Sequence, residues 1–158
     1  MSQQSVQPPA PDSYTPAPAP APARSGNVAL AVGAAALTAL ASGCAYGGIM
    51  GAIEYQIGYL AAGVGLLVGL VASRLGGRNP ILPAVSALLT LVGVYAGYVL
   101  CEAVLIHKGF PPISVTEGLT SRIAETHQSY LDNFDPISVV FFLIGAYVAF
   151  QTTRKASA

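Results

Sequence analysis

The stretch "GCAYGGIMGAIEYQIGYLAAGVGLLVG", residues 43–69, decides the fold. It consists almost entirely of glycine, alanine and aliphatic side chains, and it holds one carboxylate, Glu54. A packed soluble core uses fewer glycines, and a soluble loop uses more charge. In lipid, helices associate by close van der Waals packing, which small residues permit. The stretch therefore predicts two membrane helices joined by a short turn near Glu54, which should form a tight antiparallel hairpin.

Charge-free segments of spanning length recur along the whole chain. The sequence has 158 residues, 53% hydrophobic and only 9% charged, against a usual charged fraction of about 25%. A spanning helix needs about 20 apolar residues to cross about 30 Å of hydrocarbon. We therefore predict an all-α integral membrane protein, a bundle of four transmembrane helices, with spans at 28–52, 57–74, 80–106 and 136–153. Asp135 is predicted to cap the last span.

Basic residues are distributed unequally between the predicted loops. Five of the seven lie before the first span, between the second and third, or after the fourth: Arg24, Arg74, Arg78, Arg154 and Lys155. Only Lys108 and Arg122 lie in the loop of residues 107–135. The positive-inside rule therefore predicts a multi-pass protein of the inner or plasma membrane. Both termini, including the tail of residues 154–158, are then cytoplasmic, and the loop 107–135 is outside.

The N-terminal tail, residues 1–26, differs from the membrane domain of residues 27–153. Its segment "QPPAPDSYTPAPAPAPARSG" holds seven of the twelve prolines. Proline lacks the amide hydrogen and fixes φ, so alternating Pro and Ala cannot form a helix. The tail is predicted to be extended and disordered. It is interpreted either as a spacer or as a docking arm for a protein partner.

One alternative concerns the start of the mature chain. The run "LTALASGC", which ends at Cys44, is similar to a lipoprotein cleavage box after a hydrophobic stretch. Cleavage there would leave a lipid-bearing Cys44 as the first residue. The apolar stretch continues past Cys44 to Ile53, and the preceding tail is long for a signal peptide, which favours an uncleaved first span.

Small residues recur every fourth position in all four predicted spans. Because four residues are close to one helical turn, each row forms a smooth stripe on one face. The predicted packing residues are Gly43, Gly47, Gly51, Ala61, Gly65, Gly69, Gly93, Gly97 and Gly145. This pattern is typical of a glycine zipper. The stripes are interpreted as packing within one chain, with a homo-oligomer as the alternative.

Three polar residues near the predicted outer boundary are candidates for function. Glu102 lies about 6 Å inside the outer end of the third span, where a glutamate is too short to snorkel. It is expected to pair with His107 or with a neighbouring helix. Glu54 lies at the predicted turn, where water is within reach. Tyr46, near that turn, suits an aromatic belt at the interface with Tyr55 and Tyr59.

The outer loop is predicted to contain an amphipathic helix. "SVTE", Ser114 to Glu117, matches a capping box. Apolar residues then recur at helical intervals over about four turns: Leu119, Ile123, Tyr130, Leu131 and Phe134. Such a helix lies on the outer leaflet, covers the bundle, or offers a partner-binding face within residues 113–134.

Motifs for catalysis or cofactor binding were not found in the sequence. There is no nucleophile motif, phosphate loop or dinucleotide fingerprint. His107 and His127 are too far apart to predict a zinc site. Cys44 and Cys101 show no metal spacing, and a disulfide between them needs offset helices. A net charge of zero gives no polybasic signature for nucleic acid.

These observations predict a non-enzymatic accessory or scaffold subunit without cofactors. It would sit in the lipid bilayer and bind protein partners through residues 1–24 or 113–134. The alternative is a small transporter or channel that uses Glu102 with Glu54 and His107. A transport path normally needs polar residues near the midplane of several helices, and the central thirds of the predicted spans carry no charge.

The run "YQIGYLAAGVGLLVGLVASRLGG", residues 55–77, resembles a set of uncharacterised bacterial membrane proteins. These carry a Tyr-x-x-Gly-aromatic turn, a glycine-rich helix and a basic Arg/Gly loop, which correspond here to Tyr55, Gly58 and Tyr59, then Gly63, Gly65 and Gly69, then Arg74, Gly76 and Gly77. Gln56 stands where such relatives often place Glu. The resemblance covers about residues 43–106. It implies a small multi-span membrane protein and brings no activity, substrate or catalytic residue.

Overall fold

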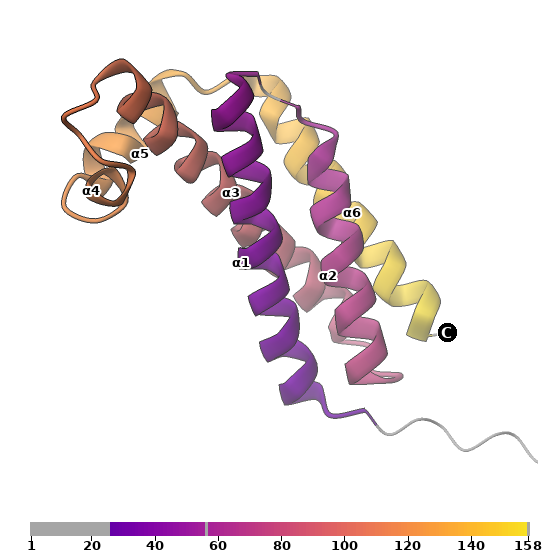
Figure 1. The fold of residues 1–158 in the computed structure, drawn as a ribbon. Helices are drawn as coiled ribbons and strands as arrows, with labels where there is room; N and C mark the ends of the chain where they lie inside the picture. The colour runs from indigo at the N-terminus through magenta and orange to yellow at the C-terminus, as the bar shows by residue number, and fades with distance from the viewer. Residues whose placement is uncertain (1–25, 56, 158) are drawn as a thin grey trace, which may run out of the picture.

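The computed structural model describes residues 26–55 and 57–157, and these residues form six helices and no strand (Figure 1). The helices are α1 Val28–Ile53, α2 Leu60–Gly76, α3 Leu82–Gly109, α4 Val115–Leu119, α5 Ile123–Asp132 and α6 Pro136–Ser157. Within the described residues, α1, α3 and α6 are long and apolar enough to cross a membrane, while α2 is apolar but only 17 residues long. The chain is therefore an all-helical membrane protein with three candidate spans. Residues 1–25, most of the predicted tail, and Gln56 lie outside the described residues.

Local signals explain where the helices begin. The side chain of Asn27 accepts a hydrogen bond from the Leu30 amide at 3.1 Å and so caps α1. Asp135 Oδ1 accepts from the Ile137 amide at 3.0 Å, which confirms the predicted cap of α6. Pro83 lies in the first turn of α3, where its missing amide hydrogen costs nothing.

The helix ends depart from the predicted spans by a few residues. The helix α2 begins at Leu60 rather than at 57, because the first helix amides bond carbonyls only three residues earlier, which makes residues 57–59 a turn. The helix α3 ends at Gly109 rather than at 106, and α6 continues past 153 through Arg154 and Lys155. Charged residues limit an apolar segment, but they do not interrupt backbone hydrogen bonding.

The four long helices pack in two parallel pairs. The helix α1 contacts α2 and α3, and α6 also contacts α2 and α3. In the first pair, Gly43 meets Gly93 and Gly47 meets Gly97, so residue numbers rise together in α1 and α3. In the second pair, Gly65 meets Gly145 of α6. We call these two contacts the glycine seams: Gly43, Gly47, Gly51, Gly93 and Gly97 in the first, and Ala61, Gly65, Gly69, Gly145 and Ala149 in the second.

At each seam the helices touch through their backbones. A Cβ atom added at Gly43, Gly47 or Gly65 would come within 3.0 Å of backbone atoms of the facing helix. Gly51 meets the side chain of Val104, and Gly69 meets Ala149 and Thr152. The glycine rows of α1 and α2 therefore do not face each other. Although α1 and α2 are in contact, each of them turns its glycine row to a helix from the second half of the chain.

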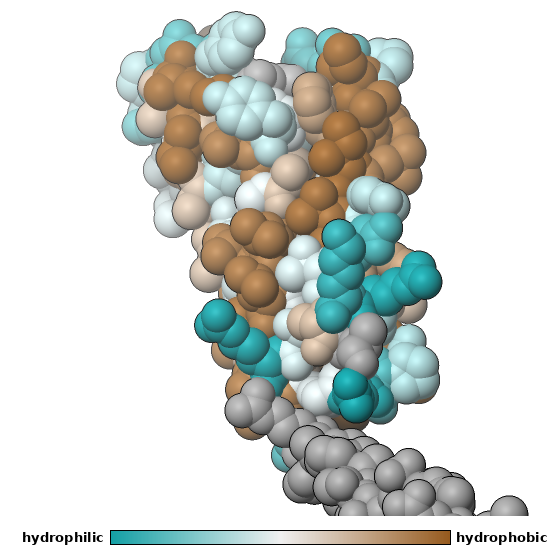
Figure 2. Space-filling model, turned by 90° about the vertical axis from the view of Figure 1, so that its right-hand side faces the viewer, coloured by the Kyte–Doolittle hydropathy of each residue, from teal (hydrophilic) through white to brown (hydrophobic). Residues whose placement is uncertain are grey.

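The end of the bundle that carries Arg74, Arg78, Arg154 and Lys155, the basic end, is held by hydroxyl groups. The Ser86 and Thr153 hydroxyls are 2.8 Å apart and join α3 to α6. Thr153 also lies 3.3 Å from the Gly69 carbonyl of α2. Figure 2 shows hydrophobic side chains over much of one face of the molecule, with strongly hydrophilic ones gathered mainly toward the basic end. Buried hydroxyls thus link three helices without burying a charge.

Candidate functional site between helix α3 and the arm

Residues 110–135, here called the arm, carry α4 and α5 and lie at the end opposite to the basic end (Figure 1). Ser114 Oγ accepts from the Glu117 amide at 3.1 Å, which confirms the predicted cap at Ser114. The prediction of one helix of about four turns is wrong, since the helix breaks after Leu119. The Thr120 hydroxyl bonds the Thr116 carbonyl at 2.7 Å, and such bonds compete with helix continuation.

Two side-chain bonds join the arm to α3. The Ser129 hydroxyl of α5 donates to Glu102 Oε1 of α3 at 2.5 Å. The Tyr95 hydroxyl and His127 Nδ1 are 2.7 Å apart. Glu102, the strongest sequence candidate, is half-buried and thus anchors the arm through a charge-assisted hydrogen bond, the stronger class of such bonds.

His107 fixes the start of the arm. Its Nδ1 lies 2.7 Å from the Ile113 carbonyl, which can only accept, so Nδ1 carries the proton. His107 lies in the last turn of α3. Of the two partners expected for Glu102, the structure shows the neighbouring helix α5 through Ser129, and not His107, which bonds the Ile113 carbonyl instead.

Glu54 pairs with Lys108, a different partner from those of Glu102 and His107. Its Oε1 accepts from Lys108 Nζ at 2.9 Å, and the same ammonium donates to the Ala52 carbonyl at 2.8 Å. A cation at the C-terminus of α1 is favourable because the helix dipole is negative there. Both side chains of the pair are largely solvent-exposed, so the pair contributes about 0–1 kcal/mol. The three polar candidates therefore do not form one cluster.

Aromatic side chains that the sequence analysis did not single out as site residues fill the junction of α3, α5 and the bundle. Tyr130 is 8% exposed, and its ring centroid lies 5.8 Å from those of Tyr95 and Tyr98. Tyr98 stacks on Phe142 of α6 at 5.3 Å. Burial, with smaller contributions from Tyr98 and Tyr95, raises the pKa of Tyr130 to about 12, so its hydroxyl stays protonated at neutral pH.

Tyr46 also belongs to this junction. It is 3% exposed and meets Tyr98 edge to face at 5.8 Å, whereas Tyr55 and Tyr59 are about 70% exposed. The prediction of Tyr46 in an interfacial belt is therefore wrong, because its helix face is turned inward with Gly43 and Gly47. The spacing of three residues between Tyr95 and Tyr98, and again between His127 and Tyr130, was the signal available in the sequence.

The outer side of the arm carries a small charge network. Arg122 lies 3.0 Å from Glu117 Oε1 and 3.0 Å from Glu125 Oε2. Hydrogen bonding to Glu117 and the nearby charge of Glu125 raise the pKa of the Arg122 guanidinium. Two carboxylates and one guanidinium leave this network with a formal charge of −1.

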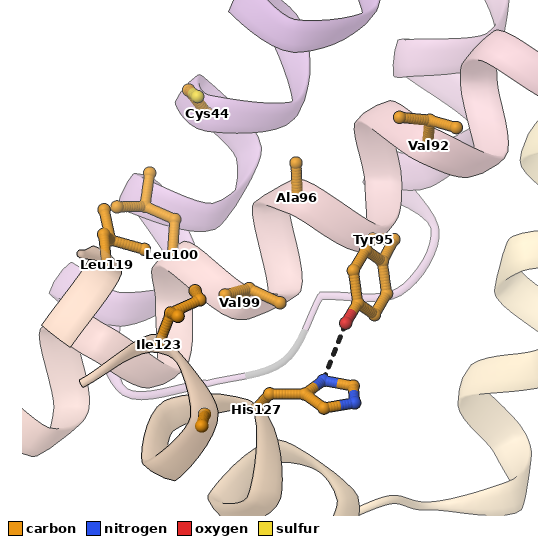
Figure 3. Close-up of a pocket in the computed structure, with 10 residues that line it drawn as sticks. Cys44, Val92, Tyr95, Ala96, Val99, Leu100, Leu119, Ile123 and His127 are labelled. Carbon is orange, nitrogen blue, oxygen red and sulfur yellow. Dashed lines mark hydrogen bonds between the residues drawn. The ribbon is translucent and has the colours of Figure 1, made fainter. Parts of the chain in front are cut away.

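A cleft of about 580 Å³ lies between α3 and the arm, next to α1 (Figure 3). The wall on α3 includes Val92, Ala96 and Val99, and α5 contributes Ile123. At one side of the cleft the Tyr95 hydroxyl points toward His127. A second, smaller cavity of about 330 Å³ between α3, α5 and α6 is also lined by Tyr95, together with Tyr130. Tyr95 thus borders both spaces.

Cys44 and Cys101 are free thiols in this structure, the first exposed at the cleft and the second buried. The helix α1 continues through Cys44 to Ile53. In the part of the chain that the structure describes, there is no group of three or more His, Cys, Asp or Glu residues that could hold a metal ion.

No protein-family model matches the chain, and no curated protein or solved structure matches it significantly. The resemblance of residues 55–77 to uncharacterised bacterial membrane proteins stays a prediction.

Proposed function

We propose that the chain is a four-span protein of the plasma membrane with both termini in the cytoplasm and the arm outside. The helix α2 is the fourth span. Its 17 residues measure about 26 Å, close to the hydrocarbon thickness of about 30 Å. It lies against α1 and α6 and shares a glycine seam with α6. The glycine seams act as a zipper that packs the spans within one chain.

The proposed role is that of a non-enzymatic accessory or scaffold subunit that presents the arm to a protein partner. The observation that carries this proposal is the fixed attachment of the arm. Ser129 and His127 of α5 flank its buried face and both bond α3. The arm also exposes apolar side chains, with Leu131 47% and Phe134 39% exposed. A surface held in place before binding loses little conformational freedom on association. The tail, residues 1–24, is a second candidate for partner binding.

The transport alternative receives less support from the contacts. Glu102, Glu54 and His107 each have a separate partner. Among the described residues, no Asp, Glu, Lys, Arg or His is buried, and the buried Ser and Thr residues are Ser73, Ser86, Thr90, Thr126, Ser138 and Thr153. A proton or ion path normally uses ionisable groups inside the bundle.

Crosslinking in native membranes, followed by identification of copurifying proteins, tests the role. The full chain is compared with Leu131→Ser, with a chain lacking residues 1–24, and with the control Leu37→Val, whose site on α1 is 71% exposed. We expect one stable partner protein that copurifies with the control. It should be lost either from the Leu131→Ser variant or from the chain that lacks residues 1–24. A proton or solute flux in reconstituted vesicles that Glu102→Gln abolishes would overturn the proposal, as would a partner that every variant retains.

A further inference from the structure

If α3 spans the membrane as proposed, the cleft between α3 and the arm lies beside the spanning part of α3. Tyr95, on its wall, is at the midpoint of the 28-residue helix α3, about 20 Å from either end. Because His127 and Tyr130 of α5 contact Tyr95, the arm reaches back along α3 toward the apolar middle of that helix. Amphipathic helices typically bury their apolar face about 5–10 Å into the boundary of the acyl chains.

We propose that this cleft binds one acyl chain of a lipid from the outer leaflet, and this inference rests on the membrane embedding in the proposed function. Its volume of about 580 Å³ is within the range of about 300–1,000 Å³ of small-molecule sites. The wall is apolar on both sides: Val92, Ala96 and Val99 on α3, and Ile123 and Ala124 on α5. An apolar space of this kind is not filled by ordered water, and the bilayer supplies acyl chains directly beside it.

The polar groups near the cleft define the kind of headgroup. Arg122 precedes Ile123 of the wall, but its charge is neutralised by Glu117 and Glu125, which leave the network at −1. This charge disfavours an anionic headgroup. The cleft therefore selects a zwitterionic lipid such as phosphatidylcholine over an anionic one such as phosphatidylglycerol.

The bonds that fix the arm also fix the cleft. Ser129 and His127 of α5 hold the outer wall against α3, so the space exists before a chain enters it. A lipid in this cleft touches two walls and exchanges more slowly than one lying on the exposed faces of α1 or α6.

Photocrosslinking maps the bound chain directly. The full-length protein is reconstituted in phosphatidylcholine vesicles that contain a phosphatidylcholine with a diazirine on its acyl chain, and crosslinked residues are identified by mass spectrometry. A parallel sample uses the phosphatidylglycerol analogue. Ala96→Phe fills the cleft from α3, and Ala124→Phe fills it from α5. Leu88→Phe, at a site 64% exposed on α3 that does not line the cleft, is the matched control.

We expect crosslinks concentrated within residues 92–100 and 119–127, stronger for phosphatidylcholine. Each filling variant should reduce them about tenfold, equivalent to ~1.4 kcal/mol of binding free energy, with Leu88→Phe unchanged. Crosslinks spread evenly over exposed sites such as Leu37 and Leu143 overturn the lipid site but leave the membrane protein intact. If no residue crosslinks at all, the membrane embedding itself is wrong. Unchanged crosslinks at the cleft in both filling variants also overturn the proposal.

Discussion

The glycine seams and the arm are held by opposite means. At the seams, nothing separates the backbones of facing helices, and a Cβ at Gly47 would collide with Gly97. At the arm, individual side chains such as Ser129 and His127 make hydrogen bonds that attach it to α3. A seam therefore depends on the absence of side-chain atoms at many positions. The attachment of the arm depends on a few hydrogen bonds, and a single substitution removes one of them.

The difference predicts that the seams determine global stability. Leucine at both Gly47 and Gly65, one in each seam, forces side-chain atoms into backbone contacts. Overpacking costs about 1–3 kcal/mol per site, and separate sites add. The double variant should lose much of its thermal stability in mild detergent. Circular dichroism recorded during heating measures this loss.

A matched control is available on the same two helices. A Cβ at Gly48 or Gly63 would meet nothing within 4 Å. The double variant Gly48→Leu with Gly63→Leu should therefore melt close to the original protein. Equal melting points for the two double variants would show that the seams do not pack as described.

The arm should respond locally instead. Ser129→Ala removes the bond to Glu102, and a hydrogen bond to a charged group contributes about 1.5–3 kcal/mol. We expect faster amide exchange in residues 123–132, with exchange in α1 and α2 unchanged. The control is Ser121→Ala, whose hydroxyl makes only a 3.4 Å contact with the Glu117 carbonyl. Equal protection of α5 in Ser129→Ala and the control would contradict the role of this bond.

The smallest effect is expected at the turn after α1. Glu54 has φ 57°, a left-handed conformation that costs a non-glycine residue roughly 1–2 kcal/mol. Glu54→Gly removes this strain and also removes the exposed pair with Lys108, which contributes about 0–1 kcal/mol. The melting temperature should stay the same or rise slightly. A clear loss of stability would show that the Glu54–Lys108 pair matters more than its exposure indicates.

The same comparison explains what the sequence could predict. The stripes of small residues follow from spacing within one helix, because a missing side chain is visible in the sequence itself. The spacing does not show which stripe packs against which helix. In the structure the glycine stripe of α1 packs against α3 rather than against α2. The cap at Ser114 was predictable for the same local reason.

The arm was predictable only in part. Its apolar period predicted one helix, but α4 ends at Leu119, next to Thr120, whose hydroxyl bonds the Thr116 carbonyl. The bonds of Glu102 to Ser129 and of Tyr95 to His127 join residues far apart in the chain, and nothing local marks such pairs. Glu102 was singled out for its depth, which was a correct reason to expect a partner without indicating which one.

The topology of the chain tests the central claim of four spans most directly. In a variant with Cys44→Ser and Cys101→Ala, single cysteines are placed at Ser25, Tyr55, Asn79, Ser121 and Ala156. Intact cells are then treated with a membrane-impermeant maleimide before and after permeabilisation. We predict that cysteines at Tyr55 and Ser121 react on intact cells, and that the other three react only after permeabilisation. Reaction of the Asn79 variant on intact cells would contradict the account, because α2 or α3 would then not cross the membrane.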